Sequence, residues 1–407
     1  MKPLLYIEIA TIRLFTILIQ LLFIKCVTNA ISVDELGVYY FLLTASYTFN
    51  AILFVPLDYY QQSNLYKYVD ENISIKSFFL LNRKMIVAFI YILIVGGVIV
   101  GVLNPYYCIV FVLTSLLSVG TYFSLLLRGF INNLNHRRRA AYNLLIESVS
   151  KIIFLYVFLF IFSPNPIIVL LALFSASCVA IFFGAIYVKK MPQYCNGNIV
   201  KIKINNILKF MYPISIGAIA NWIQLQSYRL ILVPMGFSEV VGFYATVSNI
   251  GNSGMNACST IYNQLFLPDI YKTNGRFLSR YLFYAFVIIL VVLCVSVILK
   301  ETIVLLLTNA IYTKFSILIL FGIIVEAGNF IVGALTTYLG IHNLTRSSLK
   351  VTLLGLMMFI LFFSFIFFFL GITPYTIGIP IVISQIFIVG YLGKIVFKIY
   401  KINSNGK

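Results

Sequence analysis

Long apolar runs recur along the whole of this 407-residue chain. A bilayer core is about 30 Å thick, so a helix needs about 20 consecutive apolar residues to cross it. Membrane β-strands are shorter, about 10 residues, and alternate apolar with polar side chains, which these runs do not. The sequence therefore predicts an all-α integral membrane protein with about twelve transmembrane helices. They cover residues 4–27, 38–62, 83–103, 107–130, 142–162, 167–188, 207–233, 241–267, 281–299, 314–340, 351–370 and 375–393.

Composition supports the same class of protein. Hydrophobic residues make up 61 % of the chain and charged residues 10 %, whereas soluble domains carry roughly 25 % charged residues. The six cysteines are scattered and none forms a C-x-x-C pair, so neither a disulfide framework nor a zinc site is indicated. The first apolar run is too long for a cleaved signal peptide and no A-x-A-like site follows it, so we expect it to remain as a helix.

The positive charge is distributed in alternate connections. Of the 29 lysines and arginines, 23 lie at the N-terminus, in the connections near residues 67–84, 128–139, 189–209, 272–280 and 346–350, or in the tail from residue 394. Lysine and arginine are enriched in cytoplasmic loops of membrane proteins. We therefore expect both termini and all basic loops in the cytoplasm, and we do not interpret the net charge of +18 as nucleic-acid binding.

A short pattern at the start of the second run returns half a chain later. Asp34 to Tyr39 reads D-x-x-G-x-Y, and Glu239 to Tyr244 reads E-x-x-G-x-Y, a shift of 205 residues. The shift carries the second run onto the eighth. It predicts two six-helix bundles, residues 1–200 and 201–407, related by a pseudo-two-fold axis along the membrane normal. Such duplicated bundles are typical of transporters with substrate handled between the halves.

Apart from the residues counted with the basic connections and Lys314 at the edge of a span, four basic residues lie inside the predicted spans. A charge at mid-bilayer costs on the order of 2.5–3.5 kcal/mol on insertion scales, so it usually faces a partner or a wet cavity. We expect a cationic cavity lined by Arg13, Lys25, Lys151 and Arg229, which would receive an anionic headgroup. The planar fork of arginine suits a diphosphate. An alternative for Lys25 and Arg229, near span ends, is snorkelling to lipid headgroups.

Four acidic residues also lie in the spans, and we expect them to form ion pairs or couple transport to a cation. Glu147 and Lys151 are spaced i, i+4 and therefore share a helix face as a pair, which alternatively is purely structural. Glu326, midway along its span, is a candidate coupling site. Glu8 lies near the cytoplasmic side and Asp58 near the cytoplasmic end of its span. Glu8 and Glu326 are alternative partners for Arg13.

The seventh run carries polar groups beside the single tryptophan, Trp222. Asn221 and Gln224 are spaced i, i+3 and suit contact with sugar, although polar amides suit packing between helices equally well. No phosphate-binding glycine loop, zinc motif or Ser/His/Asp constellation occurs. We therefore expect no catalytic residues, no metal and no cofactor.

Together these features resemble the Wzx-type O-antigen flippases, polysaccharide-export members of the multidrug/oligosaccharidyl-lipid/polysaccharide (MOP) superfamily. The resemblance covers the whole chain as a pattern of twelve spans, a charged first helix and basic loops. Its local motifs are degenerate, and they comprise Leu36-Gly37-Val38-Tyr39, the Pro213…Trp222…Arg229 pattern and Arg138-Arg139-Ala140.

The resemblance implies a MATE-like V-shaped fold in the bacterial inner membrane. The implied substrate is an oligosaccharide linked to undecaprenyl diphosphate, moved to the periplasmic leaflet by alternating access, with coupling to a proton or sodium gradient. Membrane lipid, a polysaccharide polymerase and a chain-length regulator are the implied partners. Arg13 is the best positional match to the family's cavity residues, and Lys25, Lys151 and Arg229 are looser ones. This set of cavity residues is small, which is a departure from the family.

Two alternatives remain at this point. A cation-coupled multidrug or metabolite antiporter of the same fold would expel cations and therefore needs acidic cavity residues, which here are matched by basic ones. An O-antigen polymerase, an enzyme, has a similar length but a large external loop, whereas the longest outer connection here is about fourteen residues. We therefore expect a transporter and not an enzyme.

Overall fold

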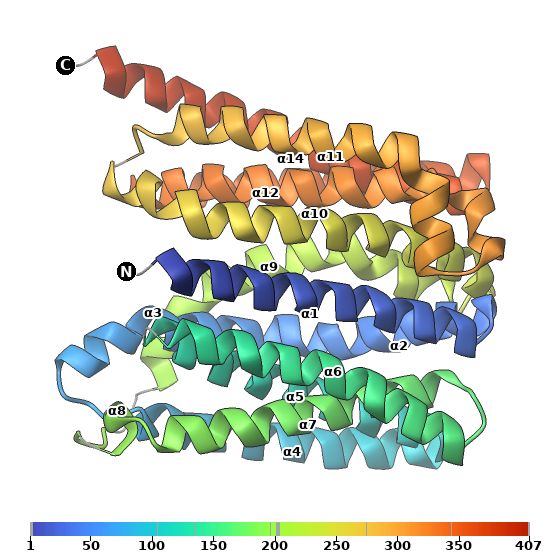
Figure 1. The fold of residues 1–407 in the computed structure, drawn as a ribbon, viewed down its shortest axis with the longest axis horizontal. Coiled ribbons are helices and arrows are strands. Elements are labelled where there is room, and N and C mark those ends of the chain that lie inside the picture. Colours follow the sequence, from blue (N-terminus) through green and yellow to red (C-terminus); the bar gives the residue numbers. More distant parts are fainter. Residues whose placement is uncertain are drawn as a thin grey trace. The chain divides into compact units, whose positions relative to one another are not determined.

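The computed structural model of the chain describes residues 3–103, 105–134, 136–195, 197–200, 204–273, 275–342 and 344–405. Over these residues it consists almost entirely of helices (Figure 1), with one isolated parallel bridge between Ile73 and Asn198. The elements, in chain order, are α1 (Pro3–Ala30), α2 (Val33–Phe49), η1 (Asn50–Phe54), α3 (Val55–Asp70), α4 (Lys76–Leu103), α5 (Pro105–Asn133), α6 (Arg137–Ile161), α7 (Pro166–Lys189), α8 (Pro192–Cys195), α9 (Ile204–Leu232), α10 (Ser238–Lys272), α11 (Leu278–Leu307), η2 (Ala310–Phe315), α12 (Leu318–Ile341), α13 (Thr345–Phe365), η3 (Ile366–Leu370) and α14 (Pro374–Asn405).

Each of the twelve predicted runs overlaps one of these helices, so the prediction of an all-helical chain is confirmed. Within the described residues, nine helices are long and apolar enough to cross a membrane: α1, α4, α5, α6, α7, α11, α12, α13 with η3, and α14. The other three runs correspond to α2–η1–α3, α9 and α10. Of these, α10 has many small polar residues, and α2 is only 17 residues long.

The second run is interrupted where α2 gives way to a π-helical turn, Asn50–Phe54. Pro56 follows this turn and has no backbone N–H to donate to the carbonyl of Ile52. In transmembrane helices, local π adjustments help to re-satisfy the backbone groups that a proline leaves without a partner. The run therefore forms two helical segments, α2 and α3, joined by η1.

The chain divides into two compact units. Unit 1 comprises Met1–Phe23 and Phe41–Ala218, and unit 2 comprises Ile24–Tyr40 and Ile219–Lys407. The predicted division at residue 200 lies before α9, whereas the structure changes unit within α9. In addition, the end of α1 and the start of α2 belong to unit 2, so the first bundle contributes a segment to the second.

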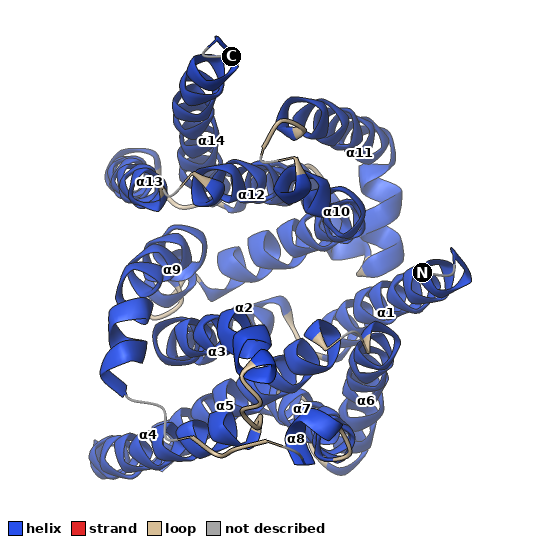
Figure 2. Ribbon diagram, turned by 90° about the vertical axis from the view of Figure 1, so that its left-hand side faces the viewer, coloured by secondary structure: helices blue, strands red, loops and turns tan. Residues whose placement is uncertain are grey.

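Unit 1 is built around α7, which packs on both α5 and α6 (Figure 2). Buried small residues recur every fourth position on α7, which places them on one face: Ala172, Ala176, Ala180 and Gly184. Small side chains let helices approach closely in membranes. A methyl group added to Gly184 would lie 3.2 Å from Cβ of Leu127 on α5. The close approach of α5, α6 and α7 brings their polar side chains into contact.

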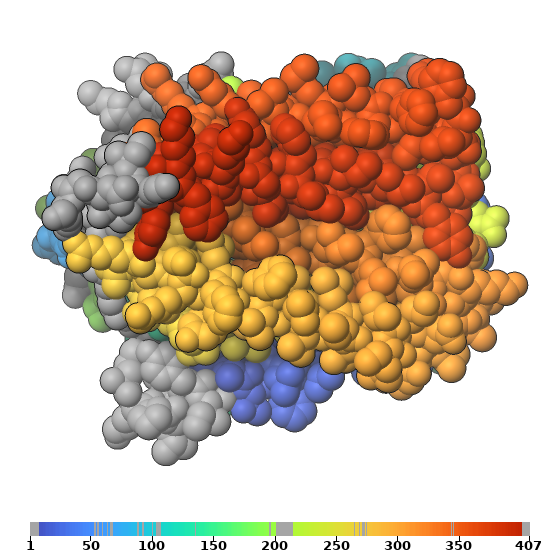
Figure 3. Space-filling view, turned by 90° about the horizontal axis from the view of Figure 1, so that it is seen from above, coloured from blue at the N-terminus to red at the C-terminus, as the bar shows by residue number. Residues whose placement is uncertain are grey.

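Unit 2 is built around α10 and α12, which form its most extensive helix contact, with α14 packed on α12 and α13. Two glycines allow this contact, because a methyl group on Gly322 would overlap the Ser248 carbonyl, and one on Gly251 would overlap that of Ile319. Residues of α11 (yellow to orange) and of α13 and α14 (orange to red) form the face of this unit shown in Figure 3. Large apolar side chains such as Ile298 and Leu361 are exposed on these helices, as a surface in contact with lipid requires.

Candidate functional site

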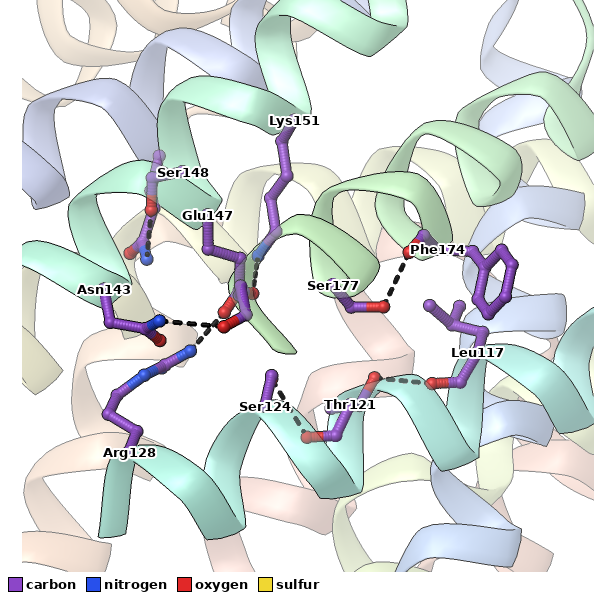
Figure 4. A network of polar contacts seen from close by, with 12 residues as sticks. Leu117, Thr121, Ser124, Arg128, Asn143, Glu147, Ser148, Lys151, Phe174 and Ser177 are labelled. Carbon is purple, nitrogen blue, oxygen red and sulfur yellow. Dashed lines mark hydrogen bonds and ion pairs between the residues drawn. The ribbon is translucent and has the colours of Figure 1, made fainter. Parts of the chain in front are cut away.

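Unit 1 contains a buried cluster of charged side chains on α5 and α6 (Figure 4). One carboxylate oxygen of Glu147 accepts a hydrogen bond from Arg128, and the other lies 2.8 Å from Nζ of Lys151. The side chains of Glu147, Arg128 and Lys151 are 10 %, 16 % and 21 % exposed. The ion pair expected from the i, i+4 spacing of Glu147 and Lys151 therefore forms, and Arg128 joins it.

Arg13 on α1 is the third cation of this region. It is half-buried and lies close enough to Arg128 for the two guanidinium groups to repel each other. Elsewhere α1 contacts α6 through Gln20, which donates to the hydroxyl of Ser148 over 3.3 Å. In this region two cations, Arg128 and Lys151, therefore contact the carboxylate of Glu147, and Arg13 adds a positive charge beside Arg128.

Most of the surrounding polar side chains donate hydrogen bonds to backbone carbonyl oxygens. Asn143, one turn before Glu147, donates to the carbonyl oxygen of Ala180 on α7 over 2.8 Å. Thr121 and Ser124 on α5 donate to carbonyl oxygens of their own helix (Figure 4). Arg128 differs, because none of the described residues accepts a hydrogen bond from its Nε. The cluster therefore has a spare N–H donor beside its carboxylate.

Sequence reasoning missed Arg128, which it grouped with the basic cytoplasmic connection. In the structure α5 continues to Asn133, and Arg128 lies between buried residues such as Leu127 and Phe130. Arg128 also falls within the predicted span 107–130, and the apolar residues on both sides were the signal that it belongs to the span and not to the connection.

The other acidic residues of unit 1 have separate partners. Glu8 pairs with Arg138 over 2.7 Å and accepts a hydrogen bond from Tyr142, so it belongs to an exposed contact between α1 and α6. Asp58 on α3 is half-buried and accepts from Gln62 over 2.7 Å. None of the described residues donates to its other oxygen. Neither carboxylate is part of the Glu147 cluster.

Unit 2 holds Arg229, which is only 4 % exposed. Its Nε donates to the hydroxyl of Tyr228 over 2.8 Å, and its guanidinium lies 5.0 Å from the ring centre of Tyr40. A nitrogen of the same group lies 3.5 Å from the side-chain oxygen of Asn249. Because Arg229 is held in this aromatic site by cation–π contacts, the snorkelling interpretation is wrong for this residue. Lys25, at the end of α1, is half-buried.

A small hollow lies beside Arg229 within unit 2. Its lining includes Gln226, Asn249 and Asn252 as well as Arg229 and Tyr228. The side-chain oxygens of Gln226 and Asn252 are buried and accept no hydrogen bond from the described residues. The hollow therefore presents one cation and unused acceptor atoms.

Gln224 and Asn221 do not share an environment. Gln224 is fully buried and donates to Ser384 over 2.9 Å and to Gln385 over 3.1 Å. Gln385 donates to Asn329, which donates to Glu326, each over 3.0 Å. In this structure the amide of Gln224 joins α9 to α14, which favours the helix-packing alternative for this residue. Asn221 is exposed on α9 and stays a candidate.

No three histidine, cysteine or acidic side chains within the described parts of the chain lie close enough together to hold a metal ion. No family model matches the sequence, and the curated proteins gave no match.

Solved structures do resemble the chain closely in fold. One is an inward-facing multidrug resistance MATE family transporter of the MOP superfamily, with 12 % identity, a TM-score of 0.63 and 96 % of each chain covered. A second, MATE in complex with MaD3S, has 12 % identity and a TM-score of 0.63, and the match covers 97 % of this chain and 96 % of that one. A third, a MOP superfamily transporter from Pyrococcus furiosus Vc1 (DSM3638), has 12 % identity, a TM-score of 0.57 and covers 96 % and 95 %. The chain is therefore an all-α, multi-pass membrane protein with the fold of MATE transporters.

Proposed function

We propose that this protein flips an oligosaccharide linked to a polyprenyl diphosphate, such as undecaprenyl diphosphate, across the bacterial inner membrane for surface polysaccharide synthesis. The observation that supports this most directly is the charge of the cluster in unit 1. Arg13, Arg128 and Lys151 are cations on helices that are apolar enough to span a membrane, and Glu147 is the carboxylate among them. Buried ions are costly unless compensated, so an excess of positive charge favours an anionic ligand.

A diphosphate matches this cluster chemically. Arginine donates two parallel N–H bonds to phosphate oxygens, and lysine adds a mobile point charge. Arg128 has an Nε donor that no described residue uses. A long lipid tail would remain in the apolar phase while the charged headgroup meets Arg13, Arg128 and Lys151.

Groups of unit 2 suit the glycan. The hollow beside Arg229 offers buried carbonyl oxygens of Gln226 and Asn252 that lack a donor among the described residues. Sugar hydroxyls are donors and acceptors and could satisfy these oxygens. In this proposal Asn221 and Arg229 contact the glycan, and Lys25 guides the headgroup outward.

A second candidate is a cation-coupled antiporter for drugs or metabolites. Several of the similar structures are of multidrug resistance MATE transporters. Half-buried carboxylates in this chain, Asp58 and Glu326, are the kind of group that exchanges a proton or sodium ion. However, in the MOP superfamily transporter from Pyrococcus furiosus the reverse polarity of the binding pocket suggests a different function.

The remaining parts of the proposal follow from the same reading. Both termini lie in the cytoplasm, because the basic connections are cytoplasmic. A proton or sodium gradient drives transport, with Glu326 or Asp58 as the coupling carboxylate. No covalent bond is made or broken, and a polysaccharide polymerase with its chain-length regulator uses the product.

The test is the surface polysaccharide of a strain that lacks this protein, resolved by chain length. Loss of both polymer and single-unit glycan from the surface, with the lipid-linked repeat accumulating inside, supports flipping. Single-unit glycan at the surface without long chains would point to a polymerase. An unchanged profile would contradict both, and drug susceptibility of the same strain would then test the antiporter.

A further inference from the structure

The carboxylate of Glu147 contacts two cations, Arg128 and Lys151, and uses a different oxygen for each. Oε2 accepts from Arg128 on α5, and Oε1 lies 2.8 Å from Nζ of Lys151 on α6 (Figure 4). Two non-bridging oxygens of a phosphate can take the same two partners. The carboxylate therefore stands where an anionic headgroup would bind most strongly.

We propose that Glu147 is an internal counter-anion, which the diphosphate displaces from Arg128 and Lys151 and which reclaims them when the substrate leaves. This inference rests on the proposed function, since it names how the same site takes up and releases its ligand. A flippase must release its substrate on the far side of the membrane, and a built-in competitor lowers affinity enough for release.

The cations need an anion at every stage. Removing one partner of a buried ion pair leaves an uncompensated charge and is strongly unfavourable. Without Glu147, the empty site would bring Arg13, Arg128 and Lys151 together with no carboxylate among them. Glu147 therefore stabilises the empty state.

The substrate offers more than the carboxylate does. A diphosphate ester has more acceptor oxygens than a carboxylate, and the Nε of Arg128 is a donor that no described residue uses. A diphosphate diester carries about one negative charge per phosphate. It therefore brings more negative charge to Arg128 and Lys151 than the single carboxylate of Glu147 does.

The side chains are also accessible enough for exchange. Glu147 is 10 % exposed, Arg128 16 % and Lys151 21 %, so none is sealed from the surface. Glu147 and Lys151 are long, flexible side chains one turn apart on α6. Rotation about their side-chain bonds can therefore move both groups while their backbone stays helical.

The test measures binding and turnover of the full-length protein with Glu147→Gln, which keeps the size of the side chain and removes its charge. The probe is farnesyl diphosphate esterified to N-acetylglucosamine, with farnesol as the uncharged control. Hydrogen bonds to charged groups are strong enough that losing the competitor should tighten binding of the probe about tenfold. Transport of the same probe in proteoliposomes should slow, because release becomes limiting.

A matched control is Glu301→Gln, which neutralises an exposed glutamate of α11 beside a lysine, Lys300. It should change neither affinity nor transport. A second comparison covers the case in which Glu147→Gln does not fold. It sets Lys151→Gln against the double variant Glu147→Gln/Lys151→Gln, which loses one positive and one negative charge and so keeps the formal charge of the native cluster. The double variant should bind the probe more tightly than Lys151→Gln alone.

Each outcome has one interpretation. Tighter binding with slower transport supports the exchange. A folded Glu147→Gln protein that binds the probe as native protein does, or more weakly, overturns it and assigns Glu147 a structural role, while binding by the native protein keeps the proposed function. Native protein that binds the probe no better than farnesol overturns the proposed function itself.

Discussion

Gly37 and Gly242, 205 residues apart, each pack against the residue four positions before the other. A methyl group on Gly37 would overlap the carbonyl of Ser238, and one on Gly242 would overlap the carbonyl of Val33 and lie 3.2 Å from the nitrogen of Gly37. The hydroxyl of Ser238 also donates to Asp34. The duplicated D/E-x-x-G-x-Y steps therefore form a reciprocal contact within unit 2, where α2 and α10 begin.

We expect Gly242→Ala to destabilise the protein by about 1–3 kcal/mol, since overpacking a close contact forces the backbones apart. Thermal unfolding of the purified protein measures this. The control is Gly254→Ala, further along the same helix, because among the described residues nothing beyond the local helix backbone lies within 4 Å of a methyl group there. Alanine is also the better helix former, so Gly254→Ala should not lower the unfolding temperature. Equal destabilisation by both changes would contradict the packing argument.

The sequence predicted the repeat but not the contact between its copies. The glycine and tyrosine at equivalent positions are visible as letters, whereas the packing of Gly37 against Ser238 depends on how helices distant in sequence meet. The helices themselves were predictable, because a bilayer requires long apolar runs. The grouping of Ile24–Tyr40 with unit 2 was not, because only tertiary contacts define it.

The charged site was predictable to a similar extent. The i, i+4 spacing of Glu147 and Lys151 specifies a pair on one helix, and the structure contains it. Arg128 comes from another helix, and no local pattern reports a partner 19 residues away. For Gln224 the sequence left two roles open, because a polar residue in a span can either contact a ligand or join two helices. Only the structure shows that its amide joins α9 to α14.

We expect Arg128→Gln to abolish transport and Arg128→Lys to retain part of it. In Arg128→Gln, Glu147 keeps its contact with Lys151 and loses the one with Arg128. The change also removes the planar guanidinium group that would hold the diphosphate. Lysine restores the charge without the planar geometry. Surface glycan in a strain carrying each variant at normal expression measures this. Arg137→Gln, an exposed arginine at the start of α6, should leave the glycan unchanged. Normal export by Arg128→Gln would remove Arg128 from the site.

We also expect Arg13→Ala to abolish export, whereas Arg13→Lys retains part of it. Arg13 adds positive charge beside Arg128 without being a contact of Glu147 in the pairs described above. Its loss should therefore weaken binding of a diphosphate probe and leave the unfolding temperature close to that of the native protein. Both quantities are measurable on the same purified protein. Full activity of Arg13→Ala at normal expression would contradict a cationic site for the headgroup.

Two amide side chains of α9 differ in their surroundings: Gln224 is buried and joins two helices, whereas Asn221 is exposed and is a candidate for binding. Gln224→Leu should lower the free energy of unfolding by about 1–3 kcal/mol, because Ser384 and Gln385 lose a buried hydrogen-bond partner. Asn221→Leu replaces an exposed side chain, so its stability should stay near that of the native protein. If Asn221 contacts glycan, export should fall in Asn221→Leu although the protein remains folded. Thermal unfolding together with surface glycan resolves the two effects. A stable, fully active Asn221→Leu protein would leave the hollow beside Arg229, with Gln226 and Asn252, as the remaining candidate for sugar recognition.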